Sequence, residues 1–268
     1  MAQKLSFSAA VVCHKGCERP NNEDSFFFNG DYMPLKEMDK GACIAESFQA
    51  LPQLYAVCDG MGGIQRGERA SFLAVRRLAA LLNDAPRRGM KDAIERYACE
   101  TSDLICHDAR KSRAENEGTT LAMLAFLKDA AYVANVGDSR VYRLRGRALE
   151  RLTQDHSLIN EQRMAGALQI TDEQARKHRR GNVITRFLGM HADARPQGEL
   201  AYQGRHTMAA GDRYLICSDG IWDLMSNVQI ADVLCGTKDA LSAARALVAC
   251  ALEMGGKDNA TALVIDLA

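Results

Sequence analysis

Apolar and polar positions along the chain follow two different periods, and the change of period divides it into strand-like and helix-like segments. Short apolar or alternating runs bounded by turn-forming residues predict strands at residues 5–12, 25–28, 54–58, 119–127, 131–136, 140–144, 213–217 and 260–267. Helical spacing of apolar residues, or polar helix-like sequence, predicts helices at residues 68–82, 91–113, 157–165, 171–177, 227–234 and 239–254.

The residues between these runs indicate how the segments are joined. Pro86 to Gly89 is expected to break the first long helix, and residues 29–53 mix Gly, Pro and charge without a clear period, so we expect a loop or insertion there. Very short turns join the three runs within residues 119–144, which predicts an antiparallel meander. Thr171 and Gln174 have the spacing of a helix capping box.

Strand-rich segments interrupted by helix pairs and joined by hairpins predict an α+β fold with antiparallel sheets. No linker of low complexity divides the chain, so we expect one domain over residues 1–268. A hydrophobic content of 47% with 25% charged residues is typical of a soluble globular protein.

Charge and cysteine usage narrow the class of protein. Lys+Arg and Asp+Glu balance at 34 each, which argues against nucleic acid or an anionic membrane as a partner. The sequence has neither a signal-peptide pattern nor an apolar run long enough to span a bilayer. The nine cysteines include no CxxC pair, and Cys58 and Cys217 lie inside apolar runs as expected of buried thiols. This usage suits a reducing compartment. We therefore expect a cytoplasmic protein.

Aspartates at turns and strand ends are the main candidates for chemistry. Asp59 ends a buried strand and is followed by three glycines within four positions, and an acidic residue in such a place is costly unless a cation compensates it. A single Asp-Gly pair is usually only a turn. Here two similar strands end in Asp-Gly, and further aspartates occupy comparable turns; the set is Asp24, Asp59, Asp138, Asp219 and Asp258.

Carboxylates without accompanying His or Cys favour Mg²⁺ or Mn²⁺ over zinc or copper. Several carboxylates that meet at sheet ends can hold two ions about 4 Å apart, and such a pair activates water and stabilises in-line attack on phosphorus. Arg19 lies in the same turn as Asp24 and could hold phosphate oxygens in a forked contact.

Six motifs then occur in a fixed order. They are Gly16-x-x-Arg19-x-x-Asn22-Glu-Asp24, Asp59-Gly-Met-Gly-Gly63 with Gly67-Glu68, Gly118-Thr-Thr120, Val136-Gly-Asp-Ser-Arg140, Ser218-Asp-Gly220 and Lys257-Asp-Asn-Ala-Thr261. Together they closely resemble the metal-dependent protein serine/threonine phosphatases, the PPM or type 2C family, in its bacterial form. The resemblance covers about residues 8–266. It implies a four-layer α-β-β-α sandwich of two antiparallel sheets flanked by helix pairs, with metals at one end between the sheets.

The resemblance also assigns ligands for two metal ions. By this likeness Asp59 bridges both ions and the carbonyl of Gly60 adds a ligand. Asp219 and Asp258 complete the shell of the first ion, and Asp24 serves the second mainly through water. Arg19, by the same likeness, binds the substrate phosphate.

Further residues have secondary roles by the same resemblance. Asp138 would hold a third, more weakly bound ion, and Asp219 and Asp223 would be further ligands of that ion. Glu23 is expected in the outer shell. Asn259 is expected to brace the turn that carries Asp258.

Residues 155–190 resemble the flap that lies beside the active site in this family. The chain departs from the family pattern near the metal aspartate, where candidate histidine acids are replaced by Met61 and Ile64. The proton for the leaving oxygen is then expected from a metal-bound water or an unassigned residue. His156 in the flap is interpreted as structural.

The resemblance implies a phosphatase that hydrolyses phosphoserine and phosphothreonine by direct attack of a hydroxide held by a binuclear Mn²⁺ or Mg²⁺ centre, with a third ion in addition. It also implies a role in signalling, with phosphorylated proteins including a Ser/Thr kinase as partners, and we expect a monomer. One alternative is a non-catalytic phosphoprotein-binding module, which loss of a metal aspartate would favour; none is missing. Another is a phosphatase for a non-protein phosphoester such as a nucleotide.

Overall fold

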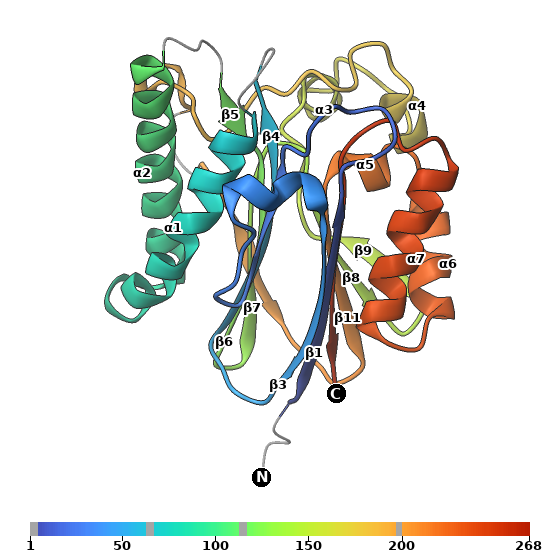
Figure 1. The fold of residues 1–268 in the computed structure, drawn as a ribbon. Coiled ribbons are helices and arrows are strands. Elements are labelled where there is room, and N and C mark those ends of the chain that lie inside the picture. Colours follow the sequence, from blue (N-terminus) through green and yellow to red (C-terminus); the bar gives the residue numbers. More distant parts are fainter. Residues whose placement is uncertain (1–4, 63–66, 113–116, 197–199) are drawn as a thin grey trace.

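Two antiparallel β-sheets face each other in the computed structural model, which describes residues 5–62, 67–112, 117–196 and 200–268 (Figure 1). The strand order of the first sheet is β3-β1-β12-β11-β8-β9, and that of the second is β10-β7-β6-β4-β2. The first sheet consists of β1 (Phe7–His14), β3 (Ala42–Phe48), β8 (Arg140–Arg145), β9 (Ala148–Arg151), β11 (Asp212–Cys217) and β12 (Ala260–Leu267). The second consists of β2 (Asp24–Phe28), β4 (Gln53–Met61), β6 (Leu121–Leu127), β7 (Ala130–Val136) and β10 (Tyr202–Thr207), and the short β5 (Gly118–Thr119) pairs with the end of β4.

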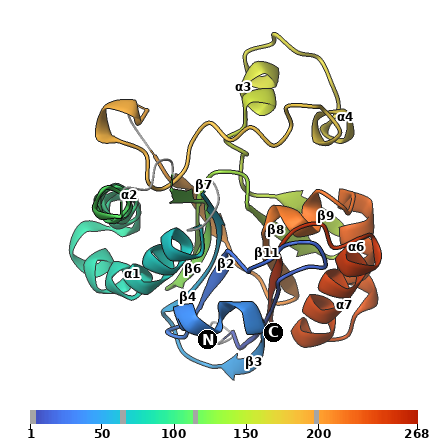
Figure 2. The same ribbon diagram turned by 45° about the horizontal axis from the view of Figure 1, so that its top comes forward.

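A pair of helices covers the outer face of each sheet. α1 (Gly67–Arg88) and α2 (Met90–Lys111) pack on the second sheet, and α6 (Asn227–Gly236) and α7 (Ala240–Glu253) cover the first (Figure 1). The predicted α+β fold with four layers is thereby confirmed. The shorter helices α3 (Leu158–Met164) and α4 (Asp172–Arg176) belong to the flap, which stands apart above the end of the sandwich in Figure 2. None of the helices in the described part of the chain has the length and apolar character needed to cross a membrane.

Strand β4 explains why its sequence is a continuous apolar run. Successive side chains of a strand point to opposite faces. Leu54 and Ala56 pack with α1 and α2, whereas Tyr55 and Val57 pack into the core between the sheets. Because both faces of β4 are buried, no polar position interrupts the run until Asp59 at the edge of the core.

The prediction of a loop at residues 29–53 is wrong. This stretch contains a 3-10 helix, Leu35–Lys40, and the edge strand β3, which pairs antiparallel with β1. Most side chains of β3 are exposed or only partly buried, so the strand is held by main-chain hydrogen bonds and leaves no clear hydrophobic alternation in the sequence.

The predicted three-strand meander is also wrong in its last step. β6 and β7 form the expected hairpin, but β8 pairs with β11 and β9 in the other sheet. The turn at Gly137-Asp138 therefore carries the chain across the sandwich. A short turn restricts the direction of the next strand, but it does not tell which sheet that strand joins. Strand β10 was not predicted from the sequence.

Helix α1 extends beyond its predicted end at residue 82 and ends at Arg88, within the predicted break at Pro86 to Gly89. Pro86 lies in the last turn of α1, and the Gly89 N–H donates to the Ala85 carbonyl. In the flap, both predicted helices are present, and the capping box of Thr171 and Gln174 is confirmed.

Candidate active site

The five aspartates lie at one end of the sandwich, on segments from both sheets. Asp24 begins β2 directly opposite Asp59 near the end of β4. Asp219 follows β11 as the first residue of α5 (Asp219–Trp222), Asp258 precedes β12, and Asp138 lies in the turn between β7 and β8. The negative charges of the other four all raise the pKa of Asp59, so the aspartates are within electrostatic reach of one another.

Burial makes this cluster unfavourable as a set of bare carboxylates. Burial, reinforced by neighbouring aspartates, raises the pKa of Asp24 and of Asp219 to about 7. Burial and the charge of Asp219 likewise hold the pKa values of Asp59 and Asp138 well above the ordinary range. A cation among these groups would favour their charged forms.

Three carboxylate oxygens fit such a cation. Oδ1 of Asp24, Oδ1 of Asp138 and Oδ1 of Asp219 are buried and have no hydrogen-bond partner among the described residues. Unpaired buried oxygens are uncommon in proteins, and hard oxygen donors suit Mn²⁺ or Mg²⁺. Within the same described ranges, no three His, Cys, Asp or Glu side chains are already grouped around one point as metal ligands. The fit therefore depends on donor chemistry and unpaired atoms.

Two hydroxyl groups fix the orientation of Asp24. Ser218 Oγ and Thr261 Oγ1 donate to its Oδ2 over 2.7 Å and 2.6 Å, and the Thr261 N–H donates to Ser218 Oγ over 3.0 Å. Because Oδ2 is occupied in this way, Oδ1 is the free oxygen of Asp24. Sequence reasoning included both residues in motifs but assigned them no role. The available signal was their position in the sequence: Ser218 directly precedes Asp219, and Thr261 lies two residues after Asn259.

The main chain of Asp59 is held by a second group of hydroxyls. Its N–H donates to Thr120 Oγ1 over 2.9 Å, and its carbonyl accepts from Thr119 Oγ1 over 2.9 Å. Thr120 Oγ1 also lies 2.6 Å from Ser139 Oγ. The motifs at residues 59–63, 118–120 and 136–140 are thus joined through hydroxyl contacts, although Gly63 itself and Ile64 lie outside the described residues.

Close backbone contacts explain two glycines of the site. A Cβ on Gly60 would lie 2.1 Å from the carbonyl oxygen of Gly67, and one on Gly220 would lie 2.0 Å from that of Asn259. Any other residue would push these segments apart. The glycines after Asp59 and Asp219 therefore let distant parts of the chain meet at the aspartates.

Asn259 connects the turn of Asp258 with the loop that carries Arg19. Its side-chain oxygen accepts from the Glu23 N–H over 2.7 Å, and its amide nitrogen donates to the carbonyl of Lys15 over 2.7 Å. Its own N–H donates to Asp258 Oδ1 over 2.8 Å. Glu23 is half-buried, and burial raises its pKa.

Arg19 is exposed and forms an ion pair with a predicted metal ligand. Its Nη2 lies 2.6 Å from Oδ2 of Asp258. The guanidinium is thus at the mouth of the cluster, where it could change partners from a carboxylate to a phosphate. Both anions match the planar fork of arginine.

The flap is tied to the site by a buried arginine. Arg140 forms a two-bond ion pair with Asp155, at 3.0 Å and 2.7 Å, and its guanidinium lies 3.5 Å from the centre of the Trp222 ring. His156 is buried beside this pair and accepts from the Gly137 N–H over 3.2 Å. Burial lowers the pKa of His156 to about 4, so it is neutral near pH 7 and agrees with the structural interpretation.

Asp223 lies at the C-terminal end of α5, one helical turn after Asp219. Burial raises the pKa of its carboxyl group. Its backbone carbonyl accepts a hydrogen bond from the flap residue Arg176 over 2.8 Å.

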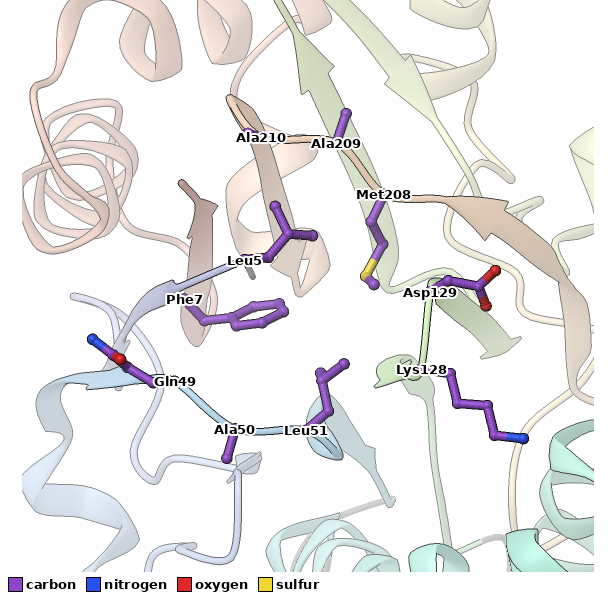
Figure 3. Close-up of a pocket in the computed structure, with 10 residues that line it drawn as sticks. All are labelled: Leu5, Phe7, Gln49, Ala50, Leu51, Lys128, Asp129, Met208, Ala209 and Ala210. Carbon is purple, nitrogen blue, oxygen red and sulfur yellow. The ribbon is translucent and has the colours of Figure 1, made fainter. Parts of the chain in front are cut away.

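A large cavity lies away from this cluster. It has a volume of about 760 Å³ and lies beside the start of β1 and the start of β4, at the opposite end of the sandwich from Asp59. Figure 3 shows the apolar side chains of Leu5, Phe7, Leu51 and Met208 directed toward one another there. The aspartate cluster and this cavity therefore lie at opposite ends of the sandwich.

The raised pKa values predict how the stability of the metal-free protein depends on pH. In the unfolded chain aspartates ionise near pH 4, whereas folded Asp24 and Asp219 keep their protons to about pH 7. The folded state thus binds more protons between these values, so its free energy of unfolding should fall as pH rises, by up to about 1.4 kcal/mol per pH unit for each extra proton.

Urea denaturation of chelator-treated protein between about pH 5 and about pH 7 would measure this slope. Mn²⁺ should reduce it, and the Asp24→Asn variant should have a smaller slope than the wild type. A stability that rises with pH over this interval would contradict the prediction.

The two-sheet sandwich and the buried carboxylates at one end of it define a class of protein suited to bind divalent metal ions. Comparison with known proteins identifies the family within that class. The family model described as protein phosphatase 2C matches residues 39–253. The chain belongs to the protein phosphatase 2C family, which confirms the resemblance noted in the sequence.

Curated relatives and solved structures agree with this assignment. Protein phosphatase PhpP of Streptococcus pneumoniae is 32% identical over 214 residues, which cover 79% of this chain and 84% of PhpP. Serine/threonine protein phosphatase PstP of Mycobacterium tuberculosis is 32% identical over 96% of this chain, which spans 44% of PstP. The crystal structure of the PstP catalytic domain in complex with two manganese ions matches with a TM-score of 0.77 and 29% identity, covering 98% of this chain and 99% of that one.

Proposed function

We propose that this chain is a metal-dependent phosphatase that removes phosphate from phosphoserine and phosphothreonine in proteins. One observation carries the proposal. Three buried carboxylate oxygens, on Asp24, Asp138 and Asp219, have no partner in the described structure and lie at the junction of the two sheets. In a chain of the protein phosphatase 2C family, such oxygens are suited to hold the divalent ions of the reaction.

Two ions would be held by Asp24, Asp59, the Gly60 carbonyl, Asp219 and Asp258. The hard oxygen donors support Mn²⁺ or Mg²⁺, and the two manganese ions in the related PstP domain support Mn²⁺ and a two-ion centre. A third ion would use Asp138 with Asp219 and Asp223. When bound, such ions lower the pKa of water and stabilise negative charge on phosphate oxygens.

The protein groups orient the substrate around these ions. Arg19 would leave Asp258 and hold two oxygens of the phosphate, because the same planar fork fits either anion. Ser218 and Thr261 would keep Asp24 aimed by occupying its other oxygen. Glu23 would act from the outer shell, and Asn259 would hold its loop against the turn of Asp258.

The proposal extends to the cellular setting. Residues 1–268 would act as one catalytic domain with a flap at about residues 155–190, as a monomer. Its substrates would be phosphorylated proteins in a signalling pathway, among them a Ser/Thr kinase. All nine cysteines are free thiols in the structure, which suits the reducing cytoplasm. The proposed function requires neither a membrane nor a nucleic-acid partner.

Phosphate release from a phosphothreonine peptide tests the function. We expect hydrolysis with Mn²⁺, loss of hydrolysis with a chelator, and recovery when Mn²⁺ is restored, because the proposed ions would lower the pKa of the attacking water and stabilise charge on the phosphate. Parallel reactions with Mg²⁺, with a phosphotyrosine peptide and with a nucleoside monophosphate would define the metal and the substrate class. Binding of the phosphopeptide without metal-dependent release would favour a non-catalytic module and overturn the proposal. Faster release from the nucleotide would favour a phosphatase for other phosphoesters.

A further inference from the structure

A run of five basic residues interrupts the balanced charge of the chain. Residues 176–180, Arg-Lys-His-Arg-Arg, begin at the last residue of α4 and extend beyond it into the flap; we refer to them as the basic flap segment. Lys177, His178, Arg179 and Arg180 are exposed, and Arg176 is partly buried. The whole chain carries no net charge, so this segment is a local feature.

Part of the positive charge of the basic flap segment has no ion-pair partner among the residues that the structure describes. Lys177 pairs with Glu173 at 2.8 Å, and Arg176 uses its Nη1 for the carbonyl of Asp223. Among side chains that the structure describes, Arg179 and Arg180 have no ion pair. Two adjacent guanidinium groups thus remain available to an anion from outside the chain.

The bond from Arg176 places the basic flap segment next to the active site. The Arg176 guanidinium contacts the carbonyl of Asp223, and the Asp223 N–H donates to the carbonyl of Asp219 over 2.8 Å. Arg176 therefore contacts the backbone of Asp223, which lies one helical turn after Asp219. Arg176 is the last residue of α4 and Asp223 directly follows α5, so this bond joins the two helix ends.

Helix capping explains only part of this charge. Basic side chains in the last turn of a helix interact favourably with its dipole, and the effect ends within that turn. α4 has five residues and ends at Arg176, whereas Arg179 and Arg180 lie three and four positions further on. The dipole of α4 therefore does not account for the charge of Arg179 and Arg180.

We propose that the basic flap segment binds anionic side chains that flank the phosphorylated residue of a substrate protein. The inference depends on the proposed phosphatase function and adds a substrate class to it: phosphoserine or phosphothreonine in an acidic or multiply phosphorylated sequence. An extended peptide advances about 3.3 Å per residue, so side chains two to four positions from the reacting phosphate lie roughly 7–13 Å from it. The basic flap segment begins at Arg176, whose bond to the Asp223 carbonyl anchors it one helical turn from Asp219.

Paired phosphothreonine peptides test the proposal. One has aspartate at positions two to four after the phosphothreonine, the second has serine there, and a third has a second phosphothreonine. We expect the wild type to have a kcat/KM about 3- to 10-fold higher for the acidic peptide than for the neutral one, the size expected of a few exposed ion pairs. The preference should shrink as salt is added. In the Arg179→Ala/Arg180→Ala variant it should disappear, while hydrolysis of the neutral peptide stays unchanged.

The chain offers a matched control for this variant. Arg87 and Arg88 are also two adjacent exposed arginines, but they lie at the end of α1, away from the flap (Figure 1). The Arg87→Ala/Arg88→Ala variant removes the same charge and should keep the preference. If only the peptide with a second phosphothreonine has a raised kcat/KM, the basic flap segment binds phosphate and not carboxylate groups.

The phosphatase function and the role of the basic flap segment would be contradicted by different results. Failure of the wild type to hydrolyse even the neutral peptide would contradict the phosphatase function. Hydrolysis of all peptides at equal rates, or a preference that survives in the Arg179→Ala/Arg180→Ala variant, would overturn the role of the basic flap segment alone.

Discussion

Replacing Asp59 with asparagine will reduce Mn²⁺-dependent phosphate release by more than about 100-fold, because residues that merely support metal ligands already contribute 10- to 100-fold. Asp59 is proposed to bind both ions, so the change removes one charge from two coordination shells. Asparagine has the same shape, and the bonds of the Asp59 main chain to Thr119 and Thr120 can persist.

The loss should be in kcat and in the apparent affinity for Mn²⁺, measured by calorimetry and by the metal dependence of the rate. The metal-free variant should be at least as stable as the metal-free wild type, since a buried charge with a raised pKa has been removed. Asp129→Asn, at an exposed turn of the opposite end, is a suitable control. Activity of Asp59→Asn within a few-fold of the wild type would exclude Asp59 as the shared ligand.

Replacing Arg19 with alanine will lower kcat/KM by about 10- to 100-fold, since a hydrogen bond to a charged group contributes about 1.5–3 kcal/mol. The loss should affect a phosphothreonine peptide and p-nitrophenyl phosphate alike, because the proposed contact is with the phosphate itself. Arg19→Lys should recover only part of the activity, since an ammonium group cannot form the forked contact. The affinity for Mn²⁺ should change little.

A matched pair at the other end of the molecule controls for the loss of a surface ion pair. Arg205 pairs with Asp129 at 2.9 Å, and Arg19 pairs with Asp258 at 2.6 Å. The Arg205–Asp129 pair lies far from the aspartate cluster. Arg205→Ala should leave the kinetics unchanged. If Arg19→Ala behaves in the same way, the phosphate of the substrate is held by another group.

The sequence predicts well those elements whose two faces differ or are both buried. β4 and β11 were identified because their apolar runs end at Asp-Gly, and the long helices because a wide apolar face packs on a sheet. β3 and β10 were missed since they are edge strands with many exposed or partly buried side chains. Their position depends on main-chain pairing with a neighbour, which leaves little trace in side-chain pattern.

The candidate site was predicted at the level of residue types and order. Turn aspartates and glycines have a recognisable local sequence, so Asp24, Asp59 and Asp219 could be named in advance. The contacts that orient them could not, because they join segments up to 237 residues apart, as Thr261 does with Asp24. A hydroxyl group has no distinctive pattern in a sequence, and its partner is decided only when the two sheets meet.

The pair of hydrogen bonds from Ser218 and Thr261 to Asp24 has a consequence for how this protein can vary. These bonds join the ends of β11 and β12 to β2, an edge strand whose one neighbour in its sheet is β4. Loss of either hydroxyl leaves a buried carboxylate short of a donor, which is costly. At the other end, the cavity beside Leu5 and Met208 leaves room for larger side chains. Mutational tolerance should therefore be graded along the strands, low where hydrogen bonds join the sheets and higher where the cavity leaves room.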